Sequence, residues 1–429
     1  MSGIGGAVPV RVGRLLEVHM HGRHIADLTS TREGRAKLEY QPGASDLTVG
    51  LSCSLPSVGV RYQGEEVLNW LGGLLPDRSE VLAAWRSRYG VRRSDAFALL
   101  WHVGQDVAGA ARFIQPGTDP VSRSLRPVSD VEVGRRVRDL TADASAWSPS
   151  TGTGQFSLAG AQAKFALART DSGWAVPSGA APTTHIFKPA IPRLADQDLN
   201  EHLTMRLAAE VGLPVAPTWL EEFDGARVLI VRRFDRYPDD TGAWHRVHQE
   251  DAVQALGLSP SLKYESQGGP GAKRVLGVLR DHVTDGHALE DIATFLDAVA
   301  FNWLVVGTDA HARNYAVLHH GQSTRLAPLY DLNSFLPYRG DRPSSLAMRV
   351  GFTEVDPAQV SRSDWDELAR DCAVDSEQLL ARIEDMAGRI VLAAERVVEA
   401  PDVTRWESSV PAILLDLLDE HVTACRVRL

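Results

Sequence analysis

Cysteine is scarce in this sequence. The 429 residues contain only Cys53, Cys372 and Cys425, with no CxxC pair and no histidine pairing of the kind found in zinc sites. We therefore expect neither a disulfide framework nor a structural zinc site. Instead, we expect the three cysteines to be buried thiols of a protein in the reducing cytoplasm. A membrane span is not expected either, because no stretch approaches the roughly 18 consecutive apolar residues that one needs. The first residues also lack the charged and apolar segments of a secretion signal.

An excess of positive charge is also missing. Lysine and arginine number 45 and aspartate and glutamate 55, which gives a net charge of −10. Broad electrostatic attraction to DNA, RNA or an anionic membrane is therefore disfavoured, and any contact with DNA is expected to be indirect, through a partner. A chain of this length is too long to fold around one simple hydrophobic core, so we expect two or three domains.

Two short motifs indicate phosphoryl-transfer chemistry. Residues 308–314 have the sequence TDAHARN, and residues 329–332 have the sequence LYDL. In protein kinases a catalytic-loop Asp accepts the proton of the substrate hydroxyl, an Asn five positions later holds Mg²⁺, and a further Asp holds Mg²⁺ against the phosphates. Asp309 and Asn314 have this spacing, and Asp331 follows Asn314 by 331 − 314 = 17 positions. Asp309 is thus the predicted catalytic base, and Asn314 and Asp331 are the predicted Mg²⁺ ligands.

The surroundings of these motifs favour this interpretation over ordinary surface residues. An apolar segment with helical spacing, residues 292–304, leads into the first motif, and short extended segments around a turn at His320–Gly321 precede Asp331. The order helix, catalytic loop, hairpin and metal-binding Asp is that of a kinase. For His311 the sequence leaves two interpretations open, a functional residue or a hydrogen-bonded loop histidine.

Upstream patterns are typical of a nucleotide site. The run SLAGA from Ser157 consists of small residues before a predicted strand, so its backbone amides could approach phosphates closely; the same residues also make any tight turn. Lys188 ends a β-rich segment, as a nucleotide-binding lysine would. Glu201, on a predicted helix over 198–210, either pairs with Lys188 or is a solvated charge. A buried strand at 228–231 leads into RRFDR at 232–236, where a kinase hinge would hold adenine.

Together these motifs resemble the HipA family of toxin Ser/Thr kinases from bacterial toxin–antitoxin pairs. The resemblance spans nearly the whole chain and rests on LLPD at 74–77, DVAGA at 106–110, SLAGAQAK at 157–164, HIFKP at 185–189, NE at 200–201, FDR at 234–236, HQED at 248–251, GTDAHARN at 307–314 and YDL at 330–332. It implies an α+β fold related to protein kinases and phosphatidylinositol kinases. That fold has a β-rich N-terminal part, an ATP cleft and an α-helical C-terminal lobe.

The expected domains follow from this resemblance. Residues 1–115 would form the β-rich N-terminal subdomain, residues 116–235 the ATP-binding part with the phosphate loop and hinge, and residues 236–429 a mainly α-helical lobe with the catalytic loop. Local signals predict helices with N-caps at Ser94, Ser363 and Ser376, the last followed by an apolar stripe that includes Leu379 and Ile390.

The resemblance also implies residue roles. Asp309 matches the catalytic base, Asn314 and Asp331 match the Mg²⁺ ligands, and Ser157 matches an autophosphorylation site in the phosphate loop. The implied ATP contacts are Ser157, Leu158, Ala159, Gly160, Lys188, Arg232, Phe234, Gln249, His311 and Tyr330. Arg232 departs from the pattern, because an acidic residue is expected there. Nucleotide affinity is unaffected if adenine contacts the backbone at this point, and is reduced if the side chain contributes.

The predicted function is that of an ATP- and Mg²⁺-dependent Ser/Thr protein kinase acting as a toxin in the cytoplasm. The resemblance implies a protein substrate in translation, such as an aminoacyl-tRNA synthetase, and a small helix-turn-helix antitoxin that binds operator DNA. Two alternatives are a small-molecule kinase with the same triad and a pseudokinase that acts as a corepressor or scaffold. The intact set of Asp309, Asn314 and Asp331 argues against the pseudokinase.

Overall fold

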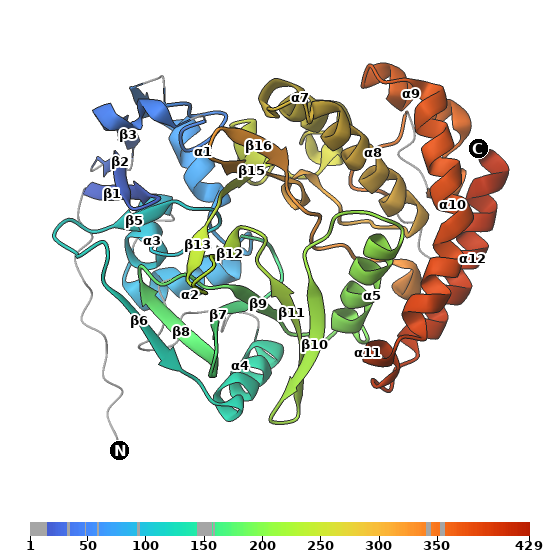
Figure 1. Ribbon diagram of the computed structural model, residues 1–429, viewed down its shortest axis with the longest axis horizontal. Helices are drawn as coiled ribbons and strands as arrows, with labels where there is room; N and C mark the ends of the chain where they lie inside the picture. The colour runs from blue at the N-terminus through green and yellow to red at the C-terminus, as the bar shows by residue number, and fades with distance from the viewer. Residues whose placement is uncertain are drawn as a thin grey trace.

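Figure 1 shows the protein, a computed structural model that describes residues 15–31, 35–47, 49–57, 60–91, 95–143, 157, 159–339, 345–351 and 357–429. The first part of the chain forms an antiparallel sheet in the order β4-β3-β2-β1-β5. Its strands are β1 (Leu15–Met20), β2 (Arg23–Ser30), β3 (Ala36–Tyr40), β4 (Arg61–Gln63) and β5 (Arg112–Ile114). A two-residue turn joins β1 to β2, and both of its residues have positive φ (His21 51°, Gly22 78°).

α1 (Glu65–Gly73) and α3 (Ala96–Val103) pack on this sheet, and α2 (Ser79–Tyr89) packs on α3. α1 buries Trp70 and α2 buries Trp85 in the same apolar core. The carboxylate of Asp95 caps α3 by accepting a hydrogen bond from Ala98 N. Ser94, the predicted cap, lies outside the described residues.

A second antiparallel sheet has the order β10-β11-β9-β7-β8-β6. Its strands are β6 (Arg123–Pro127), β7 (Phe165–Thr170), β8 (Gly173–Gly179), β9 (His185–Lys188), β10 (Thr218–Phe223) and β11 (Ala226–Arg232), and helices α4 (Asp130–Ala142) and α5 (Gln197–Glu210) pack on it.

β11 explains why this sheet needs a helix on each side. Successive strand residues point to opposite faces. Val228 and Ile230 belong to the core that includes α4, and Leu229 and Val231 belong to the core that includes α5. The strand is therefore apolar at consecutive positions, because both of its faces are buried.

The remaining part of the chain is mainly helical. Its helices are α6 (Ala252–Ala255), α7 (Ala272–His282), α8 (Ala288–Leu304), α9 (Arg362–Asp371), α10 (Ser376–Val398), α11 (Pro401–Thr404) and α12 (Val410–Arg428). A three-stranded sheet of β14 (His248–Asp251), β15 (Ala316–His320) and β16 (Ser323–Leu326) and a hairpin of β12 (Arg236–Pro238) and β13 (Trp244–Arg246) lie between these helices and the first two sheets.

The helical lobe forms one flank of the molecule, with α10 and α12 outermost (Figure 1). α10 buries the predicted stripe, including Leu379 and Ile390. Both predicted N-caps are wrong by one or two positions: Ser361 caps α9 in a capping box with Asp364, and Asp375 caps α10. The α+β class is confirmed. None of the helices in the described ranges is both long and apolar enough to cross a bilayer.

Candidate active site

The predicted catalytic loop begins where α8 ends. Gly307 is required at this bend, because a Cβ atom there would lie 2.1 Å from the side-chain oxygen of Asn302. Asp309 follows, with a side chain that is 62% exposed and therefore accessible to an incoming hydroxyl. A short 3₁₀ turn, Ala312–Asn314, returns the chain towards Asp309, and the Asn314 amide nitrogen donates to the Asp309 carbonyl oxygen at 2.7 Å. This bond fixes the amide of Asn314 and leaves its oxygen as the atom suited to a cation.

Asp331 lies opposite this loop and next to the end of β9. Its backbone has φ 60°, a left-handed conformation that Asp tolerates better than most residues. The Lys188 ammonium donates to Asp331 Oδ1 at 2.7 Å and to Glu201 Oε1 at 2.6 Å. Lys188 and Glu201 are both buried. The pair that the sequence left open is therefore formed, as between the β3 Lys and αC Glu of protein kinases.

The electrostatics of this group are set by one lysine between two carboxylates. Burial alone would lower the pKa of Lys188, but the charges of Asp331 and Glu201 raise it above its usual range. Burial would raise the pKa of Asp331, but the charges of Lys188 and Lys164 hold it below its usual range. Asp331 is therefore ionised at neutral pH and suited to a hard divalent cation.

The loop before β7 lies beside the same group. Ser157 is fully buried, and its hydroxyl donates to Leu74 O at 2.7 Å. Asp77 N donates to Gly160 O at 3.0 Å, so the segment after α1 holds both ends of the loop. The Lys164 ammonium donates to Ala159 O at 2.8 Å, and burial together with the Lys188 charge lowers the pKa of Lys164 to about 8. Leu158 lies outside the described residues.

A central cavity brings most of the predicted residues together. It is partly open to solvent, and the space among its lining residues is about 880 Å³ when open solvent is included. Of the predicted residues, its lining includes Ala159, Gly160, Lys188, Arg232, Phe234, Gln249, His311, Asn314, Tyr330 and Asp331. Ser157 and Asp309 are not among the lining residues. Ser157 is turned into the protein, and Asp309 lines an adjoining outer groove.

The outer groove continues from the cavity past Asp309. Gly160, His311, Asn314 and Asp331 line both spaces, so a molecule in the cavity and a molecule in the groove would meet at these residues. The other groove residues come from β9–α5, α4, the segment before α7 and the segment after Asp331, and include Leu140, Ile191, Leu194, Lys263, Tyr264, Phe335 and Tyr338.

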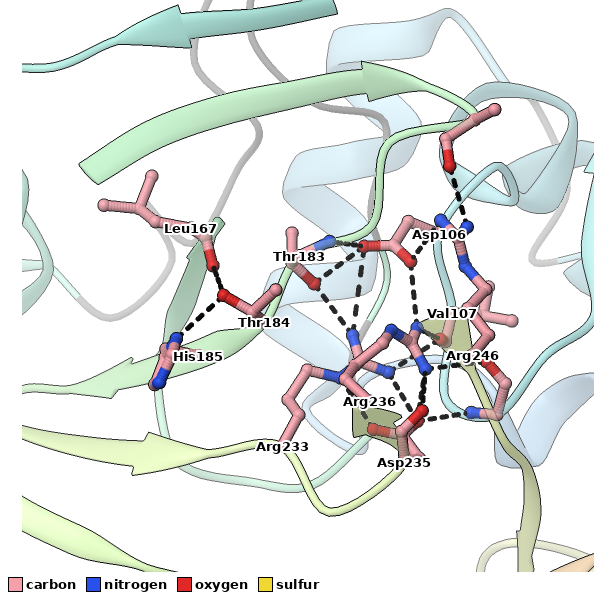
Figure 2. Close-up of polar contacts among 12 residues, drawn as sticks. Asp106, Val107, Leu167, Thr183, Thr184, His185, Arg233, Asp235, Arg236 and Arg246 are labelled. Atoms are coloured by element: carbon pink, nitrogen blue, oxygen red, sulfur yellow. Dashed lines mark hydrogen bonds and ion pairs between the residues drawn. The ribbon is translucent and has the colours of Figure 1, made fainter. Parts of the chain in front are cut away.

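The predicted hinge after β11 is held by side chains to which sequence reasoning assigned no role, although most of them lie in the motifs named above. Figure 2 shows Arg233 in a fork with Asp235, with bonds to Asp235 Oδ1 at 2.9 Å and Oδ2 at 2.7 Å. Asp106, which follows α3, accepts from Arg236 and Arg246 at 3.0 Å each. Burial would raise the pKa of Asp106, but the charges of Arg246, Arg236 and Arg233 hold it below its usual range. The N-terminal part is therefore tied directly to the hinge.

The hinge residues differ in what they offer a ligand. The Arg232 guanidinium lies 5.7 Å from the ring centre of Trp244, and its backbone N–H donates to Pro217 O. The Phe234 and Tyr330 rings lie 5.2 Å apart at the cavity wall, and the Tyr330 hydroxyl donates to Arg313 O at 2.8 Å. Phe234 and Tyr330 therefore form part of the cavity wall, and their contact with each other fixes the positions of the two rings.

His311 is buried, and its Nδ1 has no hydrogen-bond partner among the described residues. Burial lowers the pKa of this ring, so it is neutral at neutral pH. A buried polar atom without a partner costs free energy, and here it borders the cavity. The geometry therefore favours the functional interpretation of His311 over that of a satisfied loop histidine.

Comparisons with known proteins agree with this architecture. Residues 156–394 match the family profile described as HipA-like C-terminal domain, and residues 16–114 match HipA N-terminal domain. The putative kinase Y4mE of Sinorhizobium fredii is 36% identical over 393 residues, 90% of this chain and 92% of that protein. The serine/threonine-protein kinase toxin HipA of Shewanella oneidensis is 30% identical over 410 residues, 92% of each chain.

A solved structure extends the likeness to three dimensions. The structure of the Shewanella oneidensis toxin–antitoxin system HipA, HipB and its operator DNA contains a chain that superimposes with a TM-score of 0.81 at 26% identity. The match covers 96% of this chain and 99% of that chain. This chain belongs to the HipA family of kinases, because it matches two HipA family profiles, aligns over most of its length with relatives named as kinases, and shares their fold.

Proposed function

We propose that this protein is an ATP- and Mg²⁺-dependent serine/threonine protein kinase that acts as the toxin of a toxin–antitoxin pair. One observation carries the proposal: the exposed carboxylate of Asp309 lies beside a cavity lined by Asn314, Asp331 and the Lys188 that pairs with Glu201. This is the combination that protein kinases use for phosphoryl transfer.

The residues present fit Mg²⁺ and ATP. Asn314 and Asp331 offer one amide oxygen and one ionised carboxylate, the ligand types that Mg²⁺ prefers. When bound, Mg²⁺ would neutralise negative charge on the phosphates. Lys188 and the backbone around Gly160 would position the phosphates, and the free Nδ1 of His311 would find its missing partner in the nucleotide.

Adenine would lie at the hinge, between the strand end and the Phe234 and Tyr330 rings. Arg232 places its guanidinium against Trp244. The absence of an acid at position 232 is therefore compatible with binding through backbone groups.

In the proposed reaction Asp309 orients the acceptor hydroxyl and accepts its proton. Outside the cavity the groove is built from several elements and is open to solvent. An open groove of this kind favours a protein segment over a small molecule as the acceptor. The substrate would be a translation component such as an aminoacyl-tRNA synthetase.

The partner would be a small helix-turn-helix antitoxin of the HipB kind. The Shewanella oneidensis structure is a complex of HipA with HipB and operator DNA. The net charge of −10 is unsuited to direct contact with DNA, so the antitoxin would supply the DNA-binding surface. We place the protein in the cytoplasm, where both the antitoxin and the translation machinery occur.

The test is incubation of the purified protein with Mg-ATP and a bacterial lysate, followed by phosphosite mass spectrometry. The wild type should add phosphate to serine or threonine of a small set of proteins, and Asp309→Asn should lose transfer while it still binds ATP. Phosphate on a small molecule alone would favour the small-molecule kinase. Equal transfer by Asp309→Asn would contradict the assignment of the base.

A further inference from the structure

Tyr264 touches the proposed catalytic base. Its hydroxyl donates to Asp309 Oδ1 at 2.5 Å, and its ring meets the His311 ring edge to face at 5.0 Å between centres. Tyr264 comes from the segment between α6 and α7, 45 residues before Asp309. It also lines the outer groove, where an acceptor would enter.

Neighbouring residues fix the segment that carries Tyr264. The Lys263 ammonium pairs with Asp77 Oδ2 at 2.9 Å, and the Lys263 carbonyl accepts a hydrogen bond from Ala312 N at 3.2 Å. Glu265 accepts from the backbone N–H and the guanidinium of Arg349. Tyr264 is therefore held on both sides, and one of its three anchors, Ala312, belongs to the predicted catalytic loop.

A second property makes Tyr264 a stable donor. Burial and the hydrogen bond to Asp309 raise the pKa of the Tyr264 hydroxyl above its usual range, so the hydroxyl keeps its proton at neutral pH. A donor that keeps its proton stabilises the ionised form of its acceptor, and Asp309 must be ionised to accept a proton.

We propose that Tyr264 is a positioning residue for phosphoryl transfer, which holds Oδ1 of Asp309 so that Oδ2 faces the serine or threonine hydroxyl of the acceptor. This inference rests on the proposed function of Asp309. During transfer the acceptor oxygen forms a bond to the γ-phosphorus and its proton passes to Oδ2. The bond from the γ-phosphorus to the β–γ bridging oxygen breaks, and ADP leaves with that electron pair. Tyr264 keeps its own proton throughout.

The chain offers a matched control for this role. Tyr62 on β4 is not among the lining residues of the cavity or the groove, and its hydroxyl donates to Pro56 O at 2.8 Å. Tyr264→Phe and Tyr62→Phe therefore remove the same atom from two tyrosines that both donate a hydrogen bond. Only the first removes a hydrogen bond to Asp309.

The experiment compares wild type, Tyr264→Phe, Tyr62→Phe and Asp309→Asn in steady-state phosphorylation of an acceptor protein. We expect Tyr264→Phe to lower kcat roughly tenfold, a part of the 10²–10⁴ that general-base catalysis contributes, with the KM for ATP within about twofold of wild type. Tyr62→Phe should match wild type in both respects.

The outcomes separate two ideas. An Asp309→Asn variant with full activity would overturn the proposed function. An inactive Asp309→Asn together with wild-type kcat in Tyr264→Phe would overturn the role of Tyr264 alone. Equal losses in the two Tyr→Phe variants, or a fall in kcat with a comparable rise in the KM for ATP, would also overturn it, because the effect would then be a general change of the protein and not a loss of positioning at Asp309.

Discussion

Asp77 forms an ion pair with Arg313, a residue of the catalytic loop that lies 236 positions later in the chain. Arg313 also donates to Asp251 Oδ2 at 2.9 Å and to Gly73 O at 2.7 Å, and Asp77 also accepts from Lys263. The segment after α1 is thus connected both to the catalytic loop and, through Asp77 N and Gly160 O, to the loop before β7. The N-terminal part of the protein therefore acts as a support for the site.

Asp77→Asn tests this support. The change keeps the shape of the side chain and removes its charge, so Arg313 and Lys263 lose an ionised partner in a largely buried place. Breaking a buried pair by removing one partner costs about 3–5 kcal/mol, and we expect a loss at the lower end because Arg313 keeps Asp251. Urea unfolding measures the stability and steady-state kinetics measures kcat, which should fall as the loop loosens.

Glu39→Gln is the control for this variant. Glu39 pairs with Lys37 and Arg61 on the exposed face of the first sheet, and exposed pairs contribute little. Its stability and kcat should equal those of wild type. A similar loss in both variants would show that the Asp77 contacts have no special importance.

The pair between Lys188 and Glu201 makes a second prediction. Glu201→Gln leaves Lys188 with Asp331 as its one charged partner, so the ammonium should shift towards Asp331 and away from the phosphates. We expect Mg-ATP affinity in calorimetry to fall roughly tenfold, a change of about 1.4 kcal/mol. Lys188→Ala should weaken binding as well. Wild-type affinity in Glu201→Gln would mean that the pair does not position the lysine.

The proposed metal ligands make a third prediction. Asp331→Ala should abolish productive Mg-ATP binding, because the triphosphate would lose its main counter-ion. Asn333→Ala is a close control, since Asn333 lies two residues away and its amide accepts from Gln197. Calorimetry with Mg²⁺ present and with EDTA measures both variants. Unchanged Mg-ATP affinity in Asp331→Ala would exclude Asp331 as a ligand.

The fourth prediction concerns autophosphorylation of Ser157, whose side chain is buried. The hydroxyl donates to Leu74 O inside the protein, so the loop must leave this position before Ser157 can accept phosphate. A phosphate would add about −1.5 to −2 charge and could not return to the buried position beside Leu74 O, so the loop would stay displaced and ATP binding should stop. The measurements are phosphosite mass spectrometry after incubation in Mg-ATP and an ATP titration, with Ser157→Ala as the unmodifiable control. Full ATP affinity in the phosphorylated protein would rule this switch out.

Local signals in the sequence predicted a large part of this arrangement. The helix, loop, hairpin and Asp from 292 to 331 are close in sequence. Their arrangement could therefore be predicted from their order and spacing along the chain. The caps of α9 and α10 were misplaced because several Ser and Asp residues compete at each helix start, and tertiary packing decides among them.

Long-range pairs could not be predicted in the same way. Asp77 and Arg313, or Asp106 and Arg236, are brought together only by the folded sheets, and no spacing connects them. Tyr264 lies in a polar segment without periodicity, so nothing in the sequence pointed to Asp309 as its partner. The motifs LLPD and DVAGA did include Asp77 and Asp106, but the sequence gives no reason for the acid in either one.

The last prediction concerns acid stability and His248. This ring on β14 is buried, its Nε2 donates to Leu51 O at 3.0 Å, and its Nδ1 accepts from Ala110 N at 3.4 Å. Burial, together with the neighbouring His319, lowers the pKa of His248 to about 4, from a usual value of 6.5. The folded state therefore binds this proton more weakly than the unfolded state does.

The sign of the pH effect follows from linkage. Above pH 6.5 the His248 ring is neutral in both the folded and the unfolded protein, so its protonation does not reduce the free energy of unfolding. Between pH 6.5 and about 4 only the unfolded state is protonated, so the free energy of unfolding should fall by about 1.4 kcal/mol per pH unit, or about 3 kcal/mol in all from this residue. Urea unfolding from pH 7.5 to 4 should show this loss, and His248→Gln, which cannot be protonated, should show a shallower slope. If the variant does not fold, the ring titration of His248 in wild type by NMR decides, and a pKa near 6.5 would refute the prediction.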